Sequence, residues 1–184
     1  DEGSRIVERR SPPMSLPVDH PRLFKRSYSQ GELVADGVVH GLALIAGIIA
    51  FPVLFSRIVA HGTTGDGVAL GVYAATFFLM FGFSLAYNMT PPSPLKWLLR
   101  RFDHSAIYLM IAGTYTALLV NLDDRVWAWG LTATVWIGAL GGGAVKLIFP
   151  GRWDKLAIAL YLMLGWVAIV AIVPLLASLP AATM

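Results

Sequence analysis

Three pairs of polar residues interrupt a sequence that is otherwise largely apolar. They are Asp36 and His40, Ser84 and Asn88, and Asp103 and His104. The members of the first two pairs are four residues apart, which places them on one face of an α-helix. A carboxylate near an imidazole is a common unit in acid–base catalysis and in the surroundings of a bound metal. The same residues can also form hydrogen bonds with one another or anchor the helix ends without taking part in catalysis.

The composition places these pairs in a membrane protein. Of the 184 residues, 57% are hydrophobic and 14% are charged, and the mean hydropathy is +0.67. A soluble domain has about 25% charged residues. The chain has no cysteine, which excludes disulfides, thiolate metal sites and a cysteine nucleophile. The sequence shows neither a clustered basic face nor a soluble nucleic-acid-binding domain, so we expect membrane lipid and not nucleic acid as the partner.

Five stretches are long and apolar enough to cross the membrane as helices of about 20 residues each. They are residues 37–59, 68–89, 104–122, 126–147 and 156–178. We therefore predict an all-α integral membrane bundle of about five transmembrane helices, over residues 31–184. The run Gly141-Gly142-Gly143 is expected to bend or fray the fourth helix, and Pro91 to Trp97 to form an interfacial turn before a short amphipathic piece.

The basic residues predict the orientation. Residues 1–30 are polar and proline-containing and read as a disordered tail. Short connections make neighbouring spans antiparallel, so all but two of the fourteen Lys and Arg residues, Arg57 and Arg125, fall on the side of the tail. By the positive-inside rule, the N terminus is cytoplasmic. The expected location is the bacterial inner membrane, which the chain crosses several times.

This topology brings all three polar pairs to one depth, near the inner leaflet. Polar residues inside a membrane are costly and therefore need a partner or a function. His40, four residues inside the first span, can find its partner in Asp36 or, across the bundle, in Asp103. From the residues alone, an acid–base site and a set of helix anchors both remain open.

Several motifs of the chain resemble the hemolysin III family, the bacterial branch of the progestin and adiponectin receptor-like membrane proteins. They are SLAYN at 84–88, LLRRFDH at 98–104, IYLMIAGTY at 107–115, GELVADGVVHG at 31–41 and ALYLMLGW at 159–166. The resemblance covers about residues 28–178. It implies a seven-span fold, of which this chain shows five.

In the wider superfamily, a zinc ion is held by a histidine at the end of the second span and two in the seventh. The resemblance therefore implies a zinc-dependent lipid amide hydrolase, since a metal makes hydroxide available at neutral pH. Ser84 matches the family's serine and Asp103 its aspartate, while Glu32 and His40 match the opening motif.

The chain departs from this pattern at the metal. Asn88 stands where the first zinc histidine is expected and is a poor zinc ligand, and Asp36 stands where the family usually has asparagine. Without the seventh-span histidines, we expect no complete zinc site in the five spans. His104 points away from Asp103 on the same helix and does not readily replace a ligand.

Three functions therefore stay open. The first is a hydrolase-type or membrane-homeostasis protein at the inner leaflet, with Asp103, Ser84 and His40 as its polar centre and Glu32, Asp36, Asn88 and His104 around it. The second is a pore-forming, hemolytic protein, which would have to act as a homo-oligomer because no span carries a continuous polar stripe. The third is a non-catalytic membrane sensor or scaffold.

Overall fold

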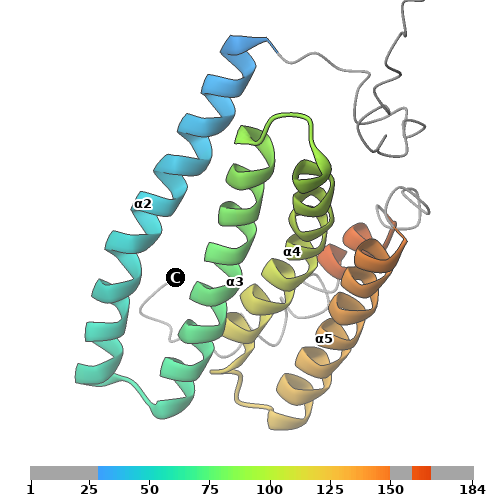
Figure 1. Ribbon diagram of the computed structural model, residues 1–184. Helices are drawn as coiled ribbons and strands as arrows, with labels where there is room; N and C mark the ends of the chain where they lie inside the picture. The colour runs from blue at the N-terminus through green and yellow to red at the C-terminus, as the bar shows by residue number, and fades with distance from the viewer. Residues whose placement is uncertain (1–28, 150–158, 167–184) are drawn as a thin grey trace, which may run out of the picture.

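The computed structural model describes residues 29–149 and 159–166 of the chain (Figure 1). The predicted tail, apart from its last two residues, and much of the predicted fifth span lie outside this part.

Four helices make up most of the described chain and run antiparallel to their neighbours (Figure 1). They are α2 (Gln30–His61), α3 (Thr64–Met89), α4 (Pro94–Leu119) and α5 (Arg125–Ile148). Residues 159–166 are also helical, and no strand occurs in the described ranges. The predicted helical bundle is confirmed.

Capping side chains extend α2 beyond the predicted apolar span. The Ser29 hydroxyl accepts a hydrogen bond from the Glu32 amide at 3.2 Å, and the Glu32 carboxylate accepts one from the Ser29 amide at 2.9 Å. This capping box satisfies two amides that have no partner within the helix, so α2 begins at Gln30 and not near residue 37. Glu32, predicted to belong to the polar cluster, is exposed and caps α2 instead.

The turn between α3 and α4 is closed by a buried lysine. The Lys96 ammonium donates to the carbonyl of Thr90 at 2.8 Å and to that of Asn88 at 3.5 Å, and it lies 4.9 Å from the centre of the Tyr87 ring. These carbonyls belong to the end of α3, where a cation is favourable. Only 7% of Lys96 is exposed, so its side chain is part of the packing between α3 and α4. The predicted amphipathic piece is the start of α4 itself.

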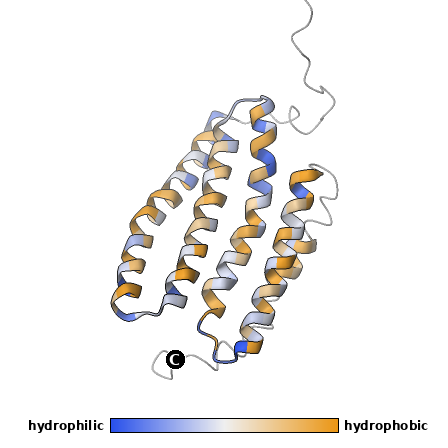
Figure 2. Cartoon of the chain, turned by 60° about the horizontal axis from the view of Figure 1, so that its bottom comes forward, coloured by the Kyte–Doolittle hydropathy of each residue, from blue (hydrophilic) through white to orange (hydrophobic). Residues whose placement is uncertain are grey.

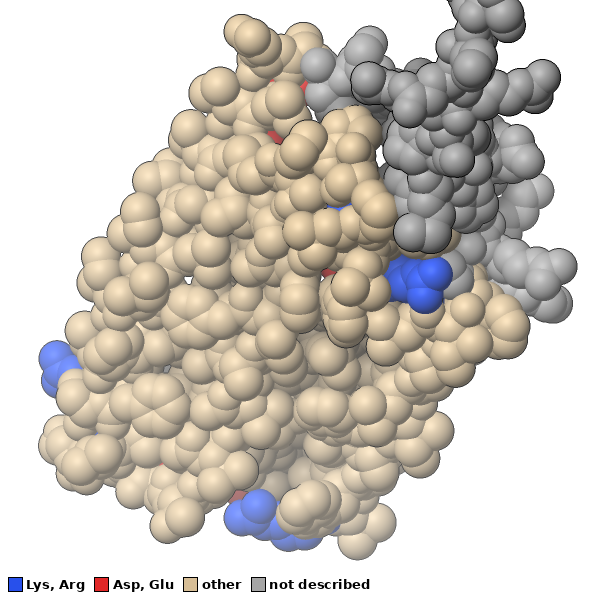
Figure 3. All heavy atoms as spheres, viewed as in Figure 1, with Lys and Arg blue, Asp and Glu red and all other residues tan. Residues whose placement is uncertain are grey.

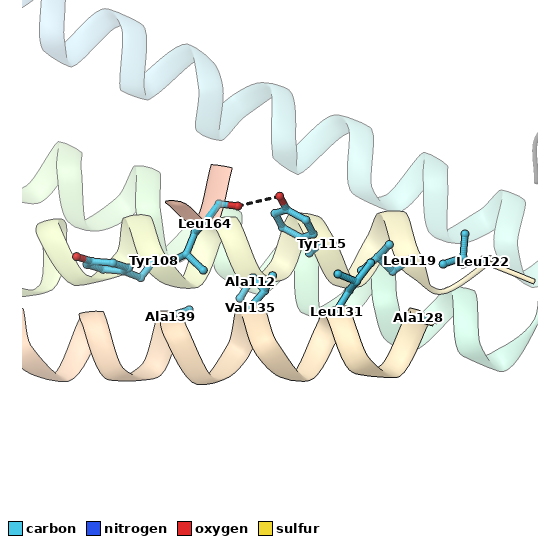
Figure 4. Packing of buried hydrophobic residues seen from close by; sticks show 10 residues of the cluster. All are labelled: Tyr108, Ala112, Tyr115, Leu119, Leu122, Ala128, Leu131, Val135, Ala139 and Leu164. Carbon is cyan, nitrogen blue, oxygen red and sulfur yellow. Dashed lines mark hydrogen bonds between the residues drawn. The ribbon is translucent and has the colours of Figure 1, made fainter. Parts of the chain in front are cut away.

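The main core lies along α4, which sits between α3 and α5 (Figure 1). Figure 4 shows its buried side chains, among them Ala112 of α4 beside Val135 of α5. The Tyr115 hydroxyl donates to the Leu164 carbonyl at 2.8 Å (Figure 4). A buried polar group costs little when it is paired in this way.

A second cluster joins α2 to α3 through aromatic rings. Phe51 is buried and lies 5.3 Å from Phe77 and 5.5 Å from Phe78, measured between ring centres. Gly47 leaves room for these rings, because a methyl group there would come within 2.7 Å of Phe77. Aromatic pairs at such distances add to the stability gained from burial alone.

The outer surface of the bundle is apolar. Ile48 and Ile49 of α2 are each 63% exposed, and Ile137 of α5 is 74% exposed. Figure 2 shows hydrophobic colour over most of the helices, with hydrophilic colour at their ends and on the first half of α4. On the face seen in Figure 3, Lys and Arg side chains appear mainly at the margins. Among the described helices, α2, α3 and α5 are long and apolar enough to cross a membrane.

The glycine run of α5 packs against α4 and does not interrupt the helix. Fraying at Gly141-Gly142-Gly143, one of the two predicted outcomes, does not occur, because α5 continues without interruption to Ile148. A methyl group on Gly142 would overlap the ring of Tyr108, whereas one on Gly141 would meet nothing within 4 Å. Close packing against a neighbouring helix, and not backbone freedom, explains Gly142.

Replacing Gly142 by alanine should therefore destabilise the bundle. We expect Gly142→Ala to lower the free energy of unfolding in detergent by about 1–3 kcal/mol, the usual cost of overpacking. Gly141→Ala is the matched control and should be neutral or stabilising, since alanine is the better helix former. Equal losses in both variants would contradict the packing role of Gly142.

Candidate functional site

The predicted polar pairs lie at one end of the bundle, where α2 begins, α3 ends and α4 begins. This end is at the top of Figure 1. Asp36 and His40 come from α2, Ser84 and Asn88 from α3, and Asp103 and His104 from α4, and all six are half-buried. Three separate helices thus contribute polar side chains at one level.

Asp103 is the centre of this group. The hydroxyl of Ser84, on the neighbouring helix, lies close enough to this carboxylate to interact with it. The side chains of His40, His104 and Arg100 lie close enough to act electrostatically on the carboxylate. A half-buried acid is favoured by a hydrogen bond and by nearby cations. The structure therefore brings together Ser84, Asp103 and His40, the three residues predicted to form the polar centre.

His40 is fixed by its own helix. Its Nδ1 lies 2.7 Å from the backbone carbonyl oxygen of Asp36, and its ring meets that of Phe81 edge-on at 5.9 Å. A carbonyl can only accept, so Nδ1 of His40 is the donor in this bond. Asp36 thus orients His40 through its backbone and not through its carboxylate.

The two remaining members of the cluster have backbone roles in the described structure. The His104 carbonyl accepts a hydrogen bond from the Tyr161 hydroxyl at 3.0 Å, which ties α4 to the helical segment 159–166. The Asn88 carbonyl accepts from Lys96.

Arg100 is a member of the site that the sequence did not single out. It precedes Asp103 by three residues and therefore shares its face of α4. Arg100 and its neighbour Arg101 lie 5.7 Å and 5.6 Å from the Trp97 ring. One guanidinium nitrogen of each arginine is buried without a hydrogen-bond partner. The signal in the sequence is its spacing of three residues from Asp103.

The donor set does not fit a zinc ion. Within residues 29–149 and 159–166, no three His, Cys, Asp or Glu side chains come together as a metal site requires. Structural and catalytic zinc sites need at least three such protein ligands. The asparagine at position 88 adds an amide, which is a weak donor for zinc.

Comparison with known proteins gives the family. The model for Haemolysin-III related proteins matches residues 32–184. The chain belongs to the hemolysin III family. It is 37% identical over 148 residues to Hemolysin-3 of Bacillus cereus, covering 80% of this chain and 68% of the relative. It is 33% identical over 151 residues to the Hemolysin-3 homolog of Bacillus subtilis (strain 168). This match covers 82% of this chain and 71% of the relative. No solved structure matches the chain.

Membership of the hemolysin III family and the apolar helices together place the protein in a membrane. In lipid, polar side chains must be satisfied by the protein itself. The contact between Ser84 and Asp103 is therefore a structural link between α3 and α4 as well as a feature of the candidate site.

The Ser84 hydroxyl should contribute measurably to stability. We expect Ser84→Ala to lower the free energy of unfolding in detergent by about 0.6–1.7 kcal/mol, the range of hydrogen bonds between helices in membrane proteins. Ser84→Thr, which keeps the hydroxyl, should recover part of the loss.

Ser56→Ala is the matched control for this measurement. The Ser56 hydroxyl donates to the Val53 carbonyl of its own helix at 2.7 Å, so its loss should change stability by less than about 0.5 kcal/mol. A loss as large as that of Ser84→Ala would argue against a bond between helices at Ser84.

Proposed function

We propose that this hemolysin III family protein carries a hydrolase-type acid–base centre that acts on membrane lipid, with Asp103 as general base. The observation that carries the proposal is the meeting of three helices at one carboxylate. Ser84 of α3 and His40 of α2 both lie close enough to the carboxylate of Asp103 of α4 to interact with it.

The proposed step is hydrolysis of an amide bond in a lipid. A water molecule attacks the carbonyl carbon while the Asp103 carboxylate accepts its proton. The carbon–nitrogen bond then breaks and the proton passes to the leaving nitrogen, so the products are a carboxylic acid and an amine. In this step Ser84 helps to position the carboxylate, and the imidazole of His40 lies close enough to interact with it.

The position of the basic residues supports a site near the inner leaflet of the bacterial inner membrane, with a cytoplasmic N terminus. Arg100 and Arg101 lie at the same end of the bundle as Asp103, whereas Arg57 and Arg125 lie at the other end. Lys and Arg are favoured on the cytoplasmic side of membrane proteins.

Metal analysis tests the role of zinc. Because the donor set of the described residues does not fit the ion, we expect the purified protein to hold well below one zinc per chain. Asn88→Ala should leave that content unchanged. Close to one zinc per chain, lost in Asp103→Ala, would contradict this prediction.

Asp103→Asn tests the acid–base centre itself. The amide keeps the shape of the side chain and can still accept from Ser84, but it is not a base. A general base contributes about 10²–10⁴-fold to a rate, so the change in cellular lipids caused by the protein should fall by at least about 100-fold. The measurement is a quantitative mass-spectrometric lipid profile at matched protein abundance.

The matched control is Asp123→Asn, an exposed aspartate in the loop between α4 and α5. It removes the same charge at the other end of the bundle and should leave the lipid profile as in wild type. The hydrolase proposal fails if cells with wild-type protein, with Asp103→Asn and without the protein have the same lipids. A change in stability alone would then favour the sensor or scaffold function.

A pore formed by one chain finds less support. At the Asp103 end, His40 and Lys96 are bonded to backbone carbonyls, and the buried core between α4 and α5 is apolar. An aqueous path would have to form between copies of the chain.

A further inference from the structure

A cavity lies at the end of the bundle opposite Asp103, between the start of α3, the end of α4 and the start of α5. Its volume is about 330 Å³. This is at the lower end of the range for small-molecule sites, about 300–1,000 Å³. It shares no lining residue with the candidate site and is independent of the proposed function.

The walls of the cavity are mainly apolar. Val68 and Ala69 of α3, Leu119 of α4 and Ala128 of α5 are among the side chains that line it. Ala69, Leu119 and Ala128 are buried, whereas Val68 is 63% exposed at the edge. Thr64, Thr116 and Thr132 also line the cavity, but most of its wall is apolar, so an acyl chain suits these walls better than a polar ligand.

One lining residue is a cation. Arg125 is exposed at the first residue of α5, and its Nη1 donates to the Val120 carbonyl at 3.3 Å. A guanidinium has five N–H donors in a planar fork that fits a phosphate. The neighbouring Asp124 does not compete for this cation, because its carboxylate accepts from the amides of Val126 and Trp127 and so caps α5.

We propose that this cavity binds an anionic phospholipid, with one acyl chain between α3, α4 and α5 and the phosphate on Arg125. The choice of an anionic phospholipid rests on the charge of Arg125 and on the position of the apolar cavity along the helices. The apolar cavity lies within the helices, and the guanidinium lies at their end, as the chain and the headgroup of a lipid do in the bilayer. Trp129, which also lines the cavity and is 71% exposed, is of the type enriched at this interface.

Photo-crosslinking in vesicles tests the proposal. The full chain is reconstituted into phosphatidylcholine vesicles that contain a trace of phosphatidylglycerol or phosphatidylcholine with a diazirine on one acyl chain. We expect more adduct with phosphatidylglycerol, mapped to peptides that contain the cavity residues 64–69, 116–120 and 125–132.

Two variants test the contributions of the lipid headgroup and of the acyl chain separately. Arg125→Gln should reduce the preference for phosphatidylglycerol about fivefold, as expected for one basic residue near a lipid surface. Thr132→Phe, at a half-buried lining position, should fill the cavity and reduce the mapped adducts of both lipids. Thermal unfolding confirms that each variant is folded.

Each variant has a control in which the same substitution is made at a residue outside the cavity. Arg57→Gln removes an exposed arginine at the same end of the bundle but outside the cavity, and Ala133→Phe adds the same ring at the next, exposed position of α5. Both should behave as wild type. The proposal is overturned if Arg57→Gln loses the preference equally, if Thr132→Phe keeps the adducts, or if wild type shows contacts between copies of the chain in place of lipid adducts.

Discussion

The close approach of α4 to both of its neighbours is the constraint on which the other contacts depend. It is possible because small residues face bulky or polar ones: Gly142 of α5 lies against Tyr108, and Gly113 of α4 lies against Thr76 of α3. Without a hydrophobic force between helices in lipid, packing and hydrogen bonds hold a bundle together. The short distance allows Ser105 to donate to the Gly143 carbonyl at 3.0 Å. It also brings Asp103 to Ser84.

α4 serves two purposes along its length. Its second half supplies the apolar core, with Ala112 and Tyr115 buried, while its first half carries Arg100 and Asp103. A half-buried carboxylate is costly unless hydrogen bonds and nearby cations favour its charge. Here both are present, from Ser84 and from Arg100. The rigid core in the second half fixes the position of the first, so the polar side chains meet in one defined arrangement.

Periodicity and composition were sufficient to predict the helices and the level at which the polar pairs meet. They depend on helix geometry and on the thickness of the membrane, which any sequence must obey. The partners of individual residues were not predictable. Lys96 is buried because the carbonyls of Thr90 and Asn88 happen to face it, and Glu32 caps α2 because Ser29 precedes it. Gly142 was misread because its neighbour, Tyr108, is 34 residues away in the chain.

Asn88 lies four residues after Ser84, where the resemblance to the wider superfamily implies a metal histidine, and its side chain is an amide. In the described part of the chain, Arg100 lies close enough to act electrostatically on Asp103, and no three potential ligands come together to hold zinc. A carboxylate bound to a divalent metal is a weak base, because the metal withdraws its electrons. A carboxylate near a serine hydroxyl keeps its lone pairs for a proton, so the proposed role of Asp103 as general base requires that it bind no metal.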